Sequence, residues 1–316
     1  MQNFVFSLNV VLPLLIMMGV GWGLKYFKVC DESFFKTANK LTFKLFLPLL
    51  LFNNIYLSDI QSSFNLKLIV FVVSSILITV ILLILIIPRI EKQNANRGVL
   101  IQALFRSNYI LFGVPICMNL FGQADMGITS MLAVFVVPLY NFLAVVVLTT
   151  YANKGNNEVW SIKKTLIDVV KNPLIIACVI GIIMATIGLK IPSVLEKTIT
   201  DISKIATPFA LIILGGEFAI SDALKNIKYI AWVSIFKLII IPAIIIFSAI
   251  LIGFRGFELG VLLSIFASPI AVSSFVMAQN VKSNDELAGQ LVATTTILSS
   301  FTIFCFILIL KSGGFI

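Results

Sequence analysis

The stretch RSNYILFGVPIC (Arg106–Cys117) places a cation, an amide and two helix-disfavouring residues inside an otherwise apolar run of the chain. Gly113 lowers helix propensity, and Pro115 removes a backbone donor. The proline also pushes Val114, the residue before it, out of the helical region. Since the surrounding run has the roughly 20 apolar residues that a membrane span needs, the sequence predicts a membrane helix that is broken close to Pro115.

A second stretch, SIFASPIAVSS (Ser264–Ser274), has the same character in the second half of the chain. Ser268 is suited to cap a new half-helix whose first residue is Pro269. Unwound backbone inside a bilayer is tolerated only where it lines a cavity or is buried in protein. Two such breaks in corresponding positions of two halves therefore indicate a binding site between them.

The whole chain has the composition of an integral membrane protein. Of its 316 residues, 59% are hydrophobic and 12% are charged, whereas soluble domains carry about 25% charged residues. Backbone groups find no water in hydrocarbon, so the spans must be helices and the fold is predicted to be all-α. The ten predicted spans are Phe4–Tyr26, Leu41–Leu57, Leu68–Ile87, Val99–Leu120, Ile128–Tyr151, Val169–Leu189, Ile199–Ile220, Tyr229–Ile252, Leu259–Ala278 and Leu287–Leu310.

The basic residues predict how the chain lies in a cell membrane. When the loops are assigned alternately to the two faces, one face receives more than twice as many Lys and Arg residues as the other. The positive-inside rule then places both termini outside and the connection 152–167 in the cytoplasm. Basic loops facing anionic lipid also account for the net charge of +9, and no basic run indicates a nucleic-acid partner.

An internal repeat divides the chain into residues 1–151 and 168–316, joined by the short linker 152–167. One constant offset aligns four pairs of residues from the two halves: Pro13 with Pro173, Gly21 with Gly181, Lys44 with Lys204, and Pro48 with Pro208. Each half carries five predicted spans, and because five is odd the second half must cross upside down, as a 5+5 inverted repeat. The alternative is that prolines coincide by chance in two hydrophobic halves.

Arg106 indicates what the two breaks could bind. It follows Arg97 by nine residues, or about 14 Å at 1.5 Å per residue, and so lies deep in a core of about 30 Å. A lone guanidinium at that depth costs at least about 2.5 kcal/mol. Half-helices starting near Pro115 and Pro269 would add partial positive charge, so the predicted counter-charge is a substrate carboxylate. The alternatives are that Arg106 pairs with Glu217 or reaches the interface.

Further polar residues complete the candidate site. The amide and hydroxyl groups beside the breaks either bind the second polar end of a substrate or hydrogen-bond between helices. Glu217 is a candidate coupling-proton site or an interfacial carboxylate, and Asn53 and Asn54 are candidates for the substrate pathway. The predicted substrate-binding residues are Arg106, Asn108, Tyr109, Gly113, Val114, Pro115, Ser268, Pro269, Ser273 and Ser274.

Other chemistries are disfavoured by the residues that the chain lacks. It contains no histidine, and its four cysteines are not spaced in pairs, so neither a catalytic set nor a metal site nor a cofactor is predicted. This counts against a membrane-embedded enzyme. A cation or proton antiporter would need Asp residues beside the breaks, and none lies there. It remains the alternative to an anion carrier, and a coupling ion, H+ or Na+, is left open.

The sequence resembles the auxin efflux carrier family, which includes plant auxin transporters and bacterial malonate or malate carriers. The resemblance extends over nearly the whole chain. It is carried by LPLLLF (Leu47–Phe52), the stretch from Asn108 to Gly113-Val-Pro115, Phe121-Gly122, Ala267-Ser-Pro269 and SFVMA (Ser274–Ala278).

The resemblance implies that the fourth and ninth spans are broken and cross in a mobile transport domain of spans 3–5 and 8–10. Spans 1, 2, 6 and 7 would form a scaffold that also makes a homodimer. The implied function is alternating-access transport of a small organic anion, a carboxylate or dicarboxylate, by an elevator-like movement. The family's crossover residues correspond to Asn108, Pro115 and Pro269. The chain departs from plant members in its short linker and in serines beside the second crossover, which counts against auxin as substrate.

Overall fold

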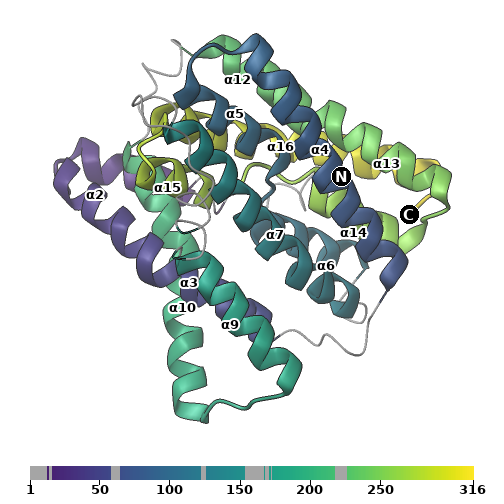
Figure 1. Cartoon of the computed structure of the whole chain (residues 1–316), viewed down its shortest axis with the longest axis horizontal. Coiled ribbons are helices and arrows are strands. Elements are labelled where there is room, and N and C mark those ends of the chain that lie inside the picture. The colour runs from purple at the N-terminus through teal and green to yellow at the C-terminus, as the bar shows by residue number, and fades with distance from the viewer. Residues whose placement is uncertain are drawn as a thin grey trace.

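The computed structural model describes residue 13 and residues 16–57, 65–121, 126–153, 167, 171, 173–217 and 226–316. Within these ranges all regular structure is helical, as the sequence predicts. In chain order (Figure 1) the elements are residues 16–26, α2 (Glu32–Leu41), η1 (Thr42–Phe46), α3 (Leu47–Tyr56), α4 (Leu66–Ile90), α5 (Asn94–Phe105), η2 (Tyr109–Gly113), α6 (Val114–Phe121), α7 (Met126–Asn153), α9 (Pro173–Ile187), α10 (Ser193–Glu217), α12 (Ile227–Ile235), η4 (Phe236–Ile240), α13 (Ile241–Ile252), α14 (Gly256–Phe266), α15 (Ser273–Asn280) and α16 (Asp285–Ser312), where η marks a π-helical segment.

Four of the described helices are long and apolar enough to cross a membrane. They are Leu66–Ile90, Phe135–Ala152, Ile227–Ile252 and Asp285–Ser312. Helical backbone also overlaps each of the other predicted spans within the described residues. The count of ten membrane crossings and the inverted relation of the two halves stay predictions.

The outward face of α4 shows why these helices belong in a bilayer. The exposed side chains along it include Val70, Ile78, Ile81, Leu82, Leu85 and Ile86. A helix on the surface of a water-soluble protein carries charged and polar residues on its outward face. An exposed apolar face that runs the length of a helix of 25 residues is instead suited to hydrocarbon.

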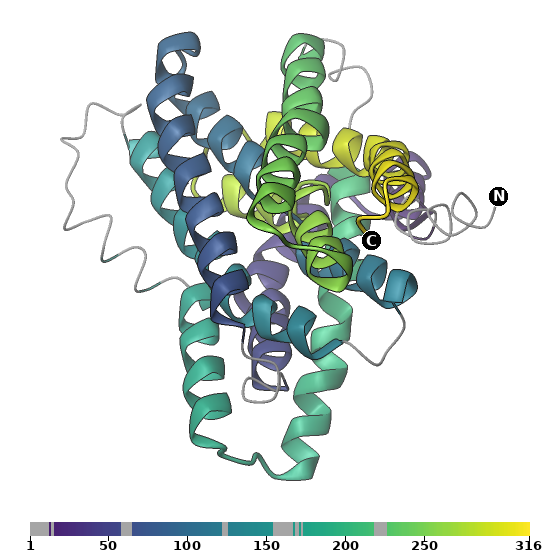
Figure 2. The same cartoon turned by 90° about the vertical axis from the view of Figure 1, so that its right-hand side faces the viewer.

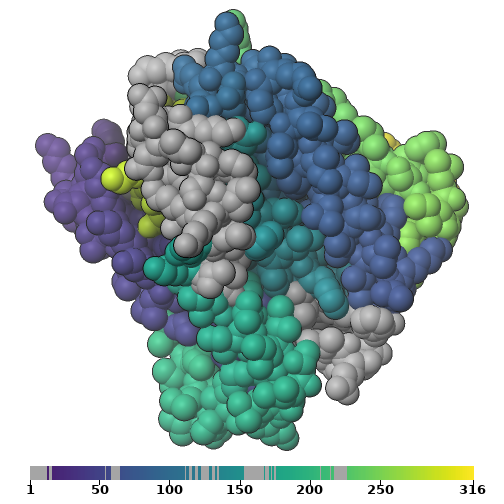
Figure 3. Space-filling view, in the orientation of Figure 1, coloured from purple at the N-terminus to yellow at the C-terminus, as the bar shows by residue number. Residues whose placement is uncertain are grey.

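The helices pack in two groups. In the first, called the α3 group here, α3 packs along α9 and α10, and α10 also contacts α2 and η1. Figures 1 and 2 show α9 and α10 reaching the lower end of the molecule, where they also project in the space-filling view of Figure 3. The second group, called the crossover group, contains α4 to α7 and α12 to α16, in which α5 packs against α4, α7 and α16.

The π-helical segments are explained by the prolines that follow them. Each described π segment ends two residues before a proline: Phe46 before Pro48, Gly113 before Pro115, and Ile240 before Pro242. A proline ring clashes with the carbonyl four residues earlier and offers that carbonyl no N–H. Here that carbonyl belongs to Lys44, Leu111 or Leu238, each inside the π segment. The wider π turn therefore lets these helices continue through the proline.

The first break lies earlier in the chain than predicted. α5 ends at Phe105, and Arg106 is extended, with φ −82° and ψ 128°. From Tyr109 the backbone is helical through Val114 and Pro115. The predictions of a break at Pro115, of a half-helix starting there and of a non-helical Val114 were therefore wrong. The π segment accommodates the proline, and the interruption falls on residues 106–108.

The second break lies where it was predicted, but its geometry differs. α14 ends at Phe266 and α15 begins at Ser273, so the new half-helix does not start at Pro269. Ser268 is not its N-cap, which is Val272. The hydroxyl of Ser268 instead donates to the Ser264 carbonyl at 2.5 Å. It therefore serves the last turn of the preceding helix, whose carbonyls have lost their helical partners.

The helix at residues 16–26 crosses α10 at glycines, where the two backbones touch. A Cβ atom at Gly21 would lie 1.8 Å from the carbonyl oxygen of Ile212, and one at Gly215 would lie 1.9 Å from that of Met18. Only residues without a side chain allow this approach, as is common where membrane helices meet. Gly23, in the same helix, does not take part in the contact, because a Cβ atom there would have no other atom within 4 Å.

We expect Gly21→Ala to lower the free energy of unfolding by about 1–3 kcal/mol, because the methyl group forces two backbones apart. Gly23→Ala, in the same helix, should be neutral or slightly stabilising, since alanine is the better helix former. Thermal unfolding of the purified variants in detergent measures both. Equal melting temperatures for the two variants would contradict the backbone contact at Gly21.

Candidate functional site

The two breaks meet each other. The backbone N–H of Asn108, in the first break, donates to the carbonyl oxygen of Pro269, in the second break, at 2.8 Å. Neither group has a partner within its own helix, because both lie where the helix is interrupted. In a protein interior such groups must be paired, and here each break supplies the partner for the other.

Two further backbone groups of the breaks are also engaged. The N–H of Ile270 donates to the hydroxyl oxygen of Thr295 on α16 at 3.3 Å. The N–H of Phe112 donates to the Asn108 carbonyl at 3.0 Å, which starts the helix that follows the first break. At Gly113 a Cβ atom would lie 2.8 Å from the Ser264 carbonyl oxygen, so the absence of a side chain allows the close approach of α14. The crossing is therefore held by α14, α16 and both breaks.

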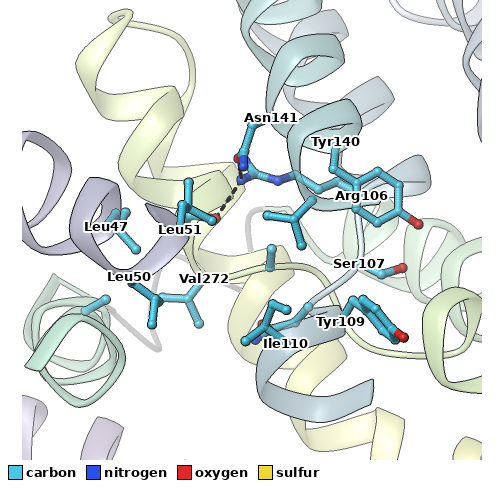
Figure 4. Close-up of a pocket in the computed structure, with 15 residues that line it drawn as sticks. Leu47, Leu50, Leu51, Arg106, Ser107, Tyr109, Ile110, Tyr140, Asn141 and Val272 are labelled. Atoms are coloured by element: carbon cyan, nitrogen blue, oxygen red, sulfur yellow. Dashed lines mark hydrogen bonds between the residues drawn. The ribbon is translucent and has the colours of Figure 1, made fainter. Parts of the chain in front are cut away.

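A cavity of about 70 Å³ opens at this crossing. Figure 4 shows it between Arg106 and Asn141 on one side and the leucines of α3 on the other. Both breaks contribute to its wall, together with α7, α10 and the first residue of α15. Its lining residues are Leu47, Leu50, Leu51, Arg106, Ser107, Asn108, Tyr109, Ile110, Val137, Tyr140, Asn141, Ala210, Ala271, Val272 and Ser273.

Arg106 is the charged residue of this wall, and its side chain is buried, with 4% of its surface exposed. Its guanidinium donates to the side-chain oxygen of Asn141 on α7 and to the hydroxyl of Ser273 at 2.7 Å, and it contacts the sulfur of Met277. These partners are neutral. Among the described residues no carboxylate pairs with Arg106, and its charge is solvated by dipoles of α7 and α15.

Three other predicted site residues are placed beside Arg106. Asn108 lines the cavity, and its side-chain nitrogen Nδ2 is buried without a partner among the described residues. Ser274 is buried, and its hydroxyl likewise has no described partner, but it does not line the cavity. Tyr109 lines the cavity, while its hydroxyl donates to the Thr129 carbonyl at 2.9 Å and so ties η2 to α7.

Other predicted residues lie away from the cavity or outside the described part. Asn53 is buried on α3, where its side-chain oxygen accepts from the Thr200 hydroxyl at 3.0 Å, and it does not line the cavity. The side chains of Asn54, Val114, Pro115 and Glu217 lie outside the described residues. In the described part of the chain no three Cys, Asp or Glu side chains gather as metal ligands would.

Three residues that complete this region were not predicted from the sequence. Asn141 supplies an acceptor for Arg106, Ser107 lines the cavity inside the first break, and the ammonium of Lys237 donates to the Ser107 hydroxyl oxygen at 2.5 Å. Lys237 could have been singled out, because a lysine inside a predicted span is rare enough to indicate function. Asn141 gave no such signal, since an asparagine in a span also serves ordinary helix packing.

A small cavity with a few polar groups on its wall, at the meeting of two broken helices within an apolar helical chain, is the arrangement of a membrane transporter. Residues 6–307 match the sequence model of the family described as "Membrane transport protein", the auxin efflux carrier family. The match covers nearly the whole chain, and the protein belongs to this family. A comparison with curated proteins found no match.

The bond between Arg106 and Asn141 gives a test of the site's geometry. We expect Asn141→Ala to cost about 1.5–3 kcal/mol more in the wild-type protein than in an Arg106→Met background, because hydrogen bonds to charged groups are worth about that much. Unfolding of the four proteins in a double-mutant cycle measures this coupling. Asn53→Ala, a buried asparagine bonded elsewhere, is the control and should be additive with Arg106→Met. A coupling below about 0.5 kcal/mol for Asn141 would exclude the bond.

Proposed function

We propose that this transporter carries a small organic anion, a carboxylate or dicarboxylate, and binds it at the crossing of the two breaks. The observation that carries the proposal is Arg106, a buried guanidinium on the cavity wall whose described partners are all neutral. A charge in this position needs a compensating anion or strong dipoles to be tolerated. A carboxylate entering the cavity would supply that anion.

The groups around Arg106 suit the binding of a carboxylate. Arginine presents a planar fork of donors that matches a carboxylate in a bidentate geometry. The buried Nδ2 of Asn108, which has no partner among the described residues, is a further donor on the same wall. A cation ligand would instead meet donors and a fixed positive charge. This supports an anion carrier over the alternative of a cation antiporter.

The size of the cavity favours a compact ligand. Its volume of about 70 Å³ is far below the roughly 300–1,000 Å³ of pockets for drug-sized ligands. A substrate of a few heavy atoms fits this proposal better than a bulky aromatic acid does. The leucines of α3 that face Arg106 in Figure 4 would contact the apolar carbons of such a substrate.

The position of the cavity supports alternating access by an elevator-like movement. Its polar wall comes from the crossover group, whereas Leu47, Leu50 and Leu51 of α3 and Ala210 of α10 belong to the α3 group. If the crossover group slides along the α3 group, the bound anion moves with it toward the other face of the membrane. In this proposal spans 1, 2, 6 and 7 stay fixed as the scaffold of a homodimer. Both termini then lie outside and the 152–167 linker is cytoplasmic.

We expect Arg106→Gln to reduce anion transport at least 10-fold, because the substitution removes the charge and the forked donor together. The measurement is counterflow in proteoliposomes with a panel of labelled mono- and dicarboxylates, with and without imposed proton and sodium gradients. Arg89→Gln is the matched control. Arg89 is exposed and bonds the Leu85 carbonyl of its own helix, so transport by this variant should stay within about twofold of the wild type.

Two results of this experiment would overturn the proposal. One is wild-type protein that exchanges none of the carboxylates on the panel. The other is an Arg106→Gln variant that transports as fast as Arg89→Gln, which would remove Arg106 from the site.

A further inference from the structure

Lys237 is a second buried basic residue at the crossing, and it is bonded to the first break. It lies in η4, the π segment of the helix Ile227–Ile252, and only 1% of its surface is exposed. It does not line the cavity. The one described group that accepts a hydrogen bond from its ammonium is the Ser107 hydroxyl oxygen, at 2.5 Å.

Ser107 connects this lysine to the proposed substrate site. It is the middle residue of the break, it lines the cavity, and its neighbours are Arg106 and Asn108. A serine hydroxyl can accept a hydrogen bond from an ammonium and donate one on its other side. It is therefore able to pass a proton from the lysine to water in the cavity.

The charged groups near Lys237 lie on its own helix and on the elements that pack against η4. Its own helix carries Lys228, which is exposed, and Tyr229, whose hydroxyl donates to the Glu91 carboxylate, and η4 packs against α5 and α16. On α5, Arg97 bonds the Asn94 side chain and the Pro88 carbonyl at the start of the helix. On α16, Asp285 and Glu286 lie in the first turn and bond Gln279 and Gln290, Lys311 lies exposed in the last turn, and Cys305 is half-buried. No described contact joins Lys237 to a charged side chain, and its one described partner, Ser107, is the residue next to Arg106 in the chain.

Lys237 and Arg106 are both buried basic side chains without a described carboxylate partner, and two desolvated positive charges close to the same break disfavour each other. Arginine cannot relieve this by losing its proton, but a buried lysine can. An anion bound at Arg106 cancels one charge and thereby stabilises the ammonium of Lys237. By linkage, a protonated Lys237 then stabilises the bound anion to the same extent.

We propose that Lys237 is a proton-binding site coupled to the substrate site. Its amine takes up one proton as the anion binds, forming the ammonium, and the N–H bond breaks when the anion leaves, with the proton passing through the Ser107 hydroxyl to water. This deepens the proposed function, since the coupling rests on anion binding at Arg106. The coupling ion is then H+, and its site lies on η4, at a residue other than Glu217.

The test uses pH jumps on proteoliposomes adsorbed to a solid-supported membrane, with no organic anion present. A proton that enters a buried site moves charge part of the way across the membrane and gives a transient current. We expect a transient between pH 8.5 and 6 in the wild type, lost in Lys237→Met and kept in Lys204→Met. Lys204 is the matched control, because it is an exposed lysine on α10 bonded to Asp201. A transient of equal size in Lys237→Met would overturn the proposal.

Ser107→Ala is a second test, which can be made even if Lys237→Met fails to fold. It keeps the lysine and removes the hydroxyl oxygen that accepts its hydrogen bond. Loss of a hydrogen bond to the ammonium destabilises the protonated form, so the pH of half-maximal charge movement should fall by about one unit. An unchanged midpoint in Ser107→Ala would contradict the proposal, because Lys237 would then not titrate next to this hydroxyl.

Addition of malonate at constant pH separates this proposal from the proposed function. Proton uptake with malonate in the wild type, absent in Lys237→Met, supports the coupling. If the wild type shows the pH transient but no response to malonate or to the other carboxylates, the proton site is supported and the proposed anion transport is contradicted. Malonate transport without proton uptake in the wild type would contradict the coupling and support the proposed anion transport.

Discussion

The hydrogen bond from the Asn108 N–H to the Pro269 carbonyl depends on a constraint that governs the whole structure: polar backbone inside an apolar protein must find a partner. A continuous helix meets this requirement alone, and an interrupted helix cannot. Two interrupted helices can do so together if they cross at their breaks. The closely packed glycine at position 113 brings α14, the first half of the second interrupted helix, to the same point, and the Thr295 hydroxyl brings α16 there.

The same constraint explains why the cavity lies at the crossing. Between its half-helices the chain has backbone polar groups that can bond other partners. A continuous helix would use these groups in its own hydrogen bonds. Arg106, the first residue of the break, is held by Asn141 and Ser273 from two other elements, so its guanidinium is oriented before any ligand arrives. Such preorganisation reduces the ordering cost of binding. On the opposite side, α3 contributes an apolar wall from a different group of helices.

Much of the fold follows from the sequence by local rules, and the exceptions have identifiable causes. Apolar runs predict the helices, because backbone groups in hydrocarbon must be hydrogen-bonded within the chain. The runs around Arg106 and Ser268 predict that two of these helices are interrupted. The exact residues of the first break could not be predicted, because Pro115 breaks a helix by local rules but is accommodated by the π segment before it. The assignment of Ser268 as an N-cap failed for a similar reason. Its hydroxyl had two possible partners, and the path of the chain after α14 decided between them.

The residues of the candidate site were predictable in part. Arg106, Asn108 and Ser273, which line the cavity, were singled out because polar groups deep in an apolar run are costly. Asn53 obeyed the same rule, yet its partner is Thr200 in a different contact, so depth alone does not distinguish a site from packing. Lys237 was overlooked because its helix has no break, and only the folded chain brings it to Ser107. Pairings of this kind depend on tertiary structure and leave no pattern along the sequence.

The most direct test of the central claim is a crystal structure of the protein with a bromine-labelled carboxylate such as bromoacetate, in which anomalous scattering locates the ligand. We expect a bromine peak in the cavity, with the carboxylate against the Arg106 guanidinium and between residues 106–108 and 267–272. A peak elsewhere in the protein, or density in which these two segments run as continuous helices, would contradict it.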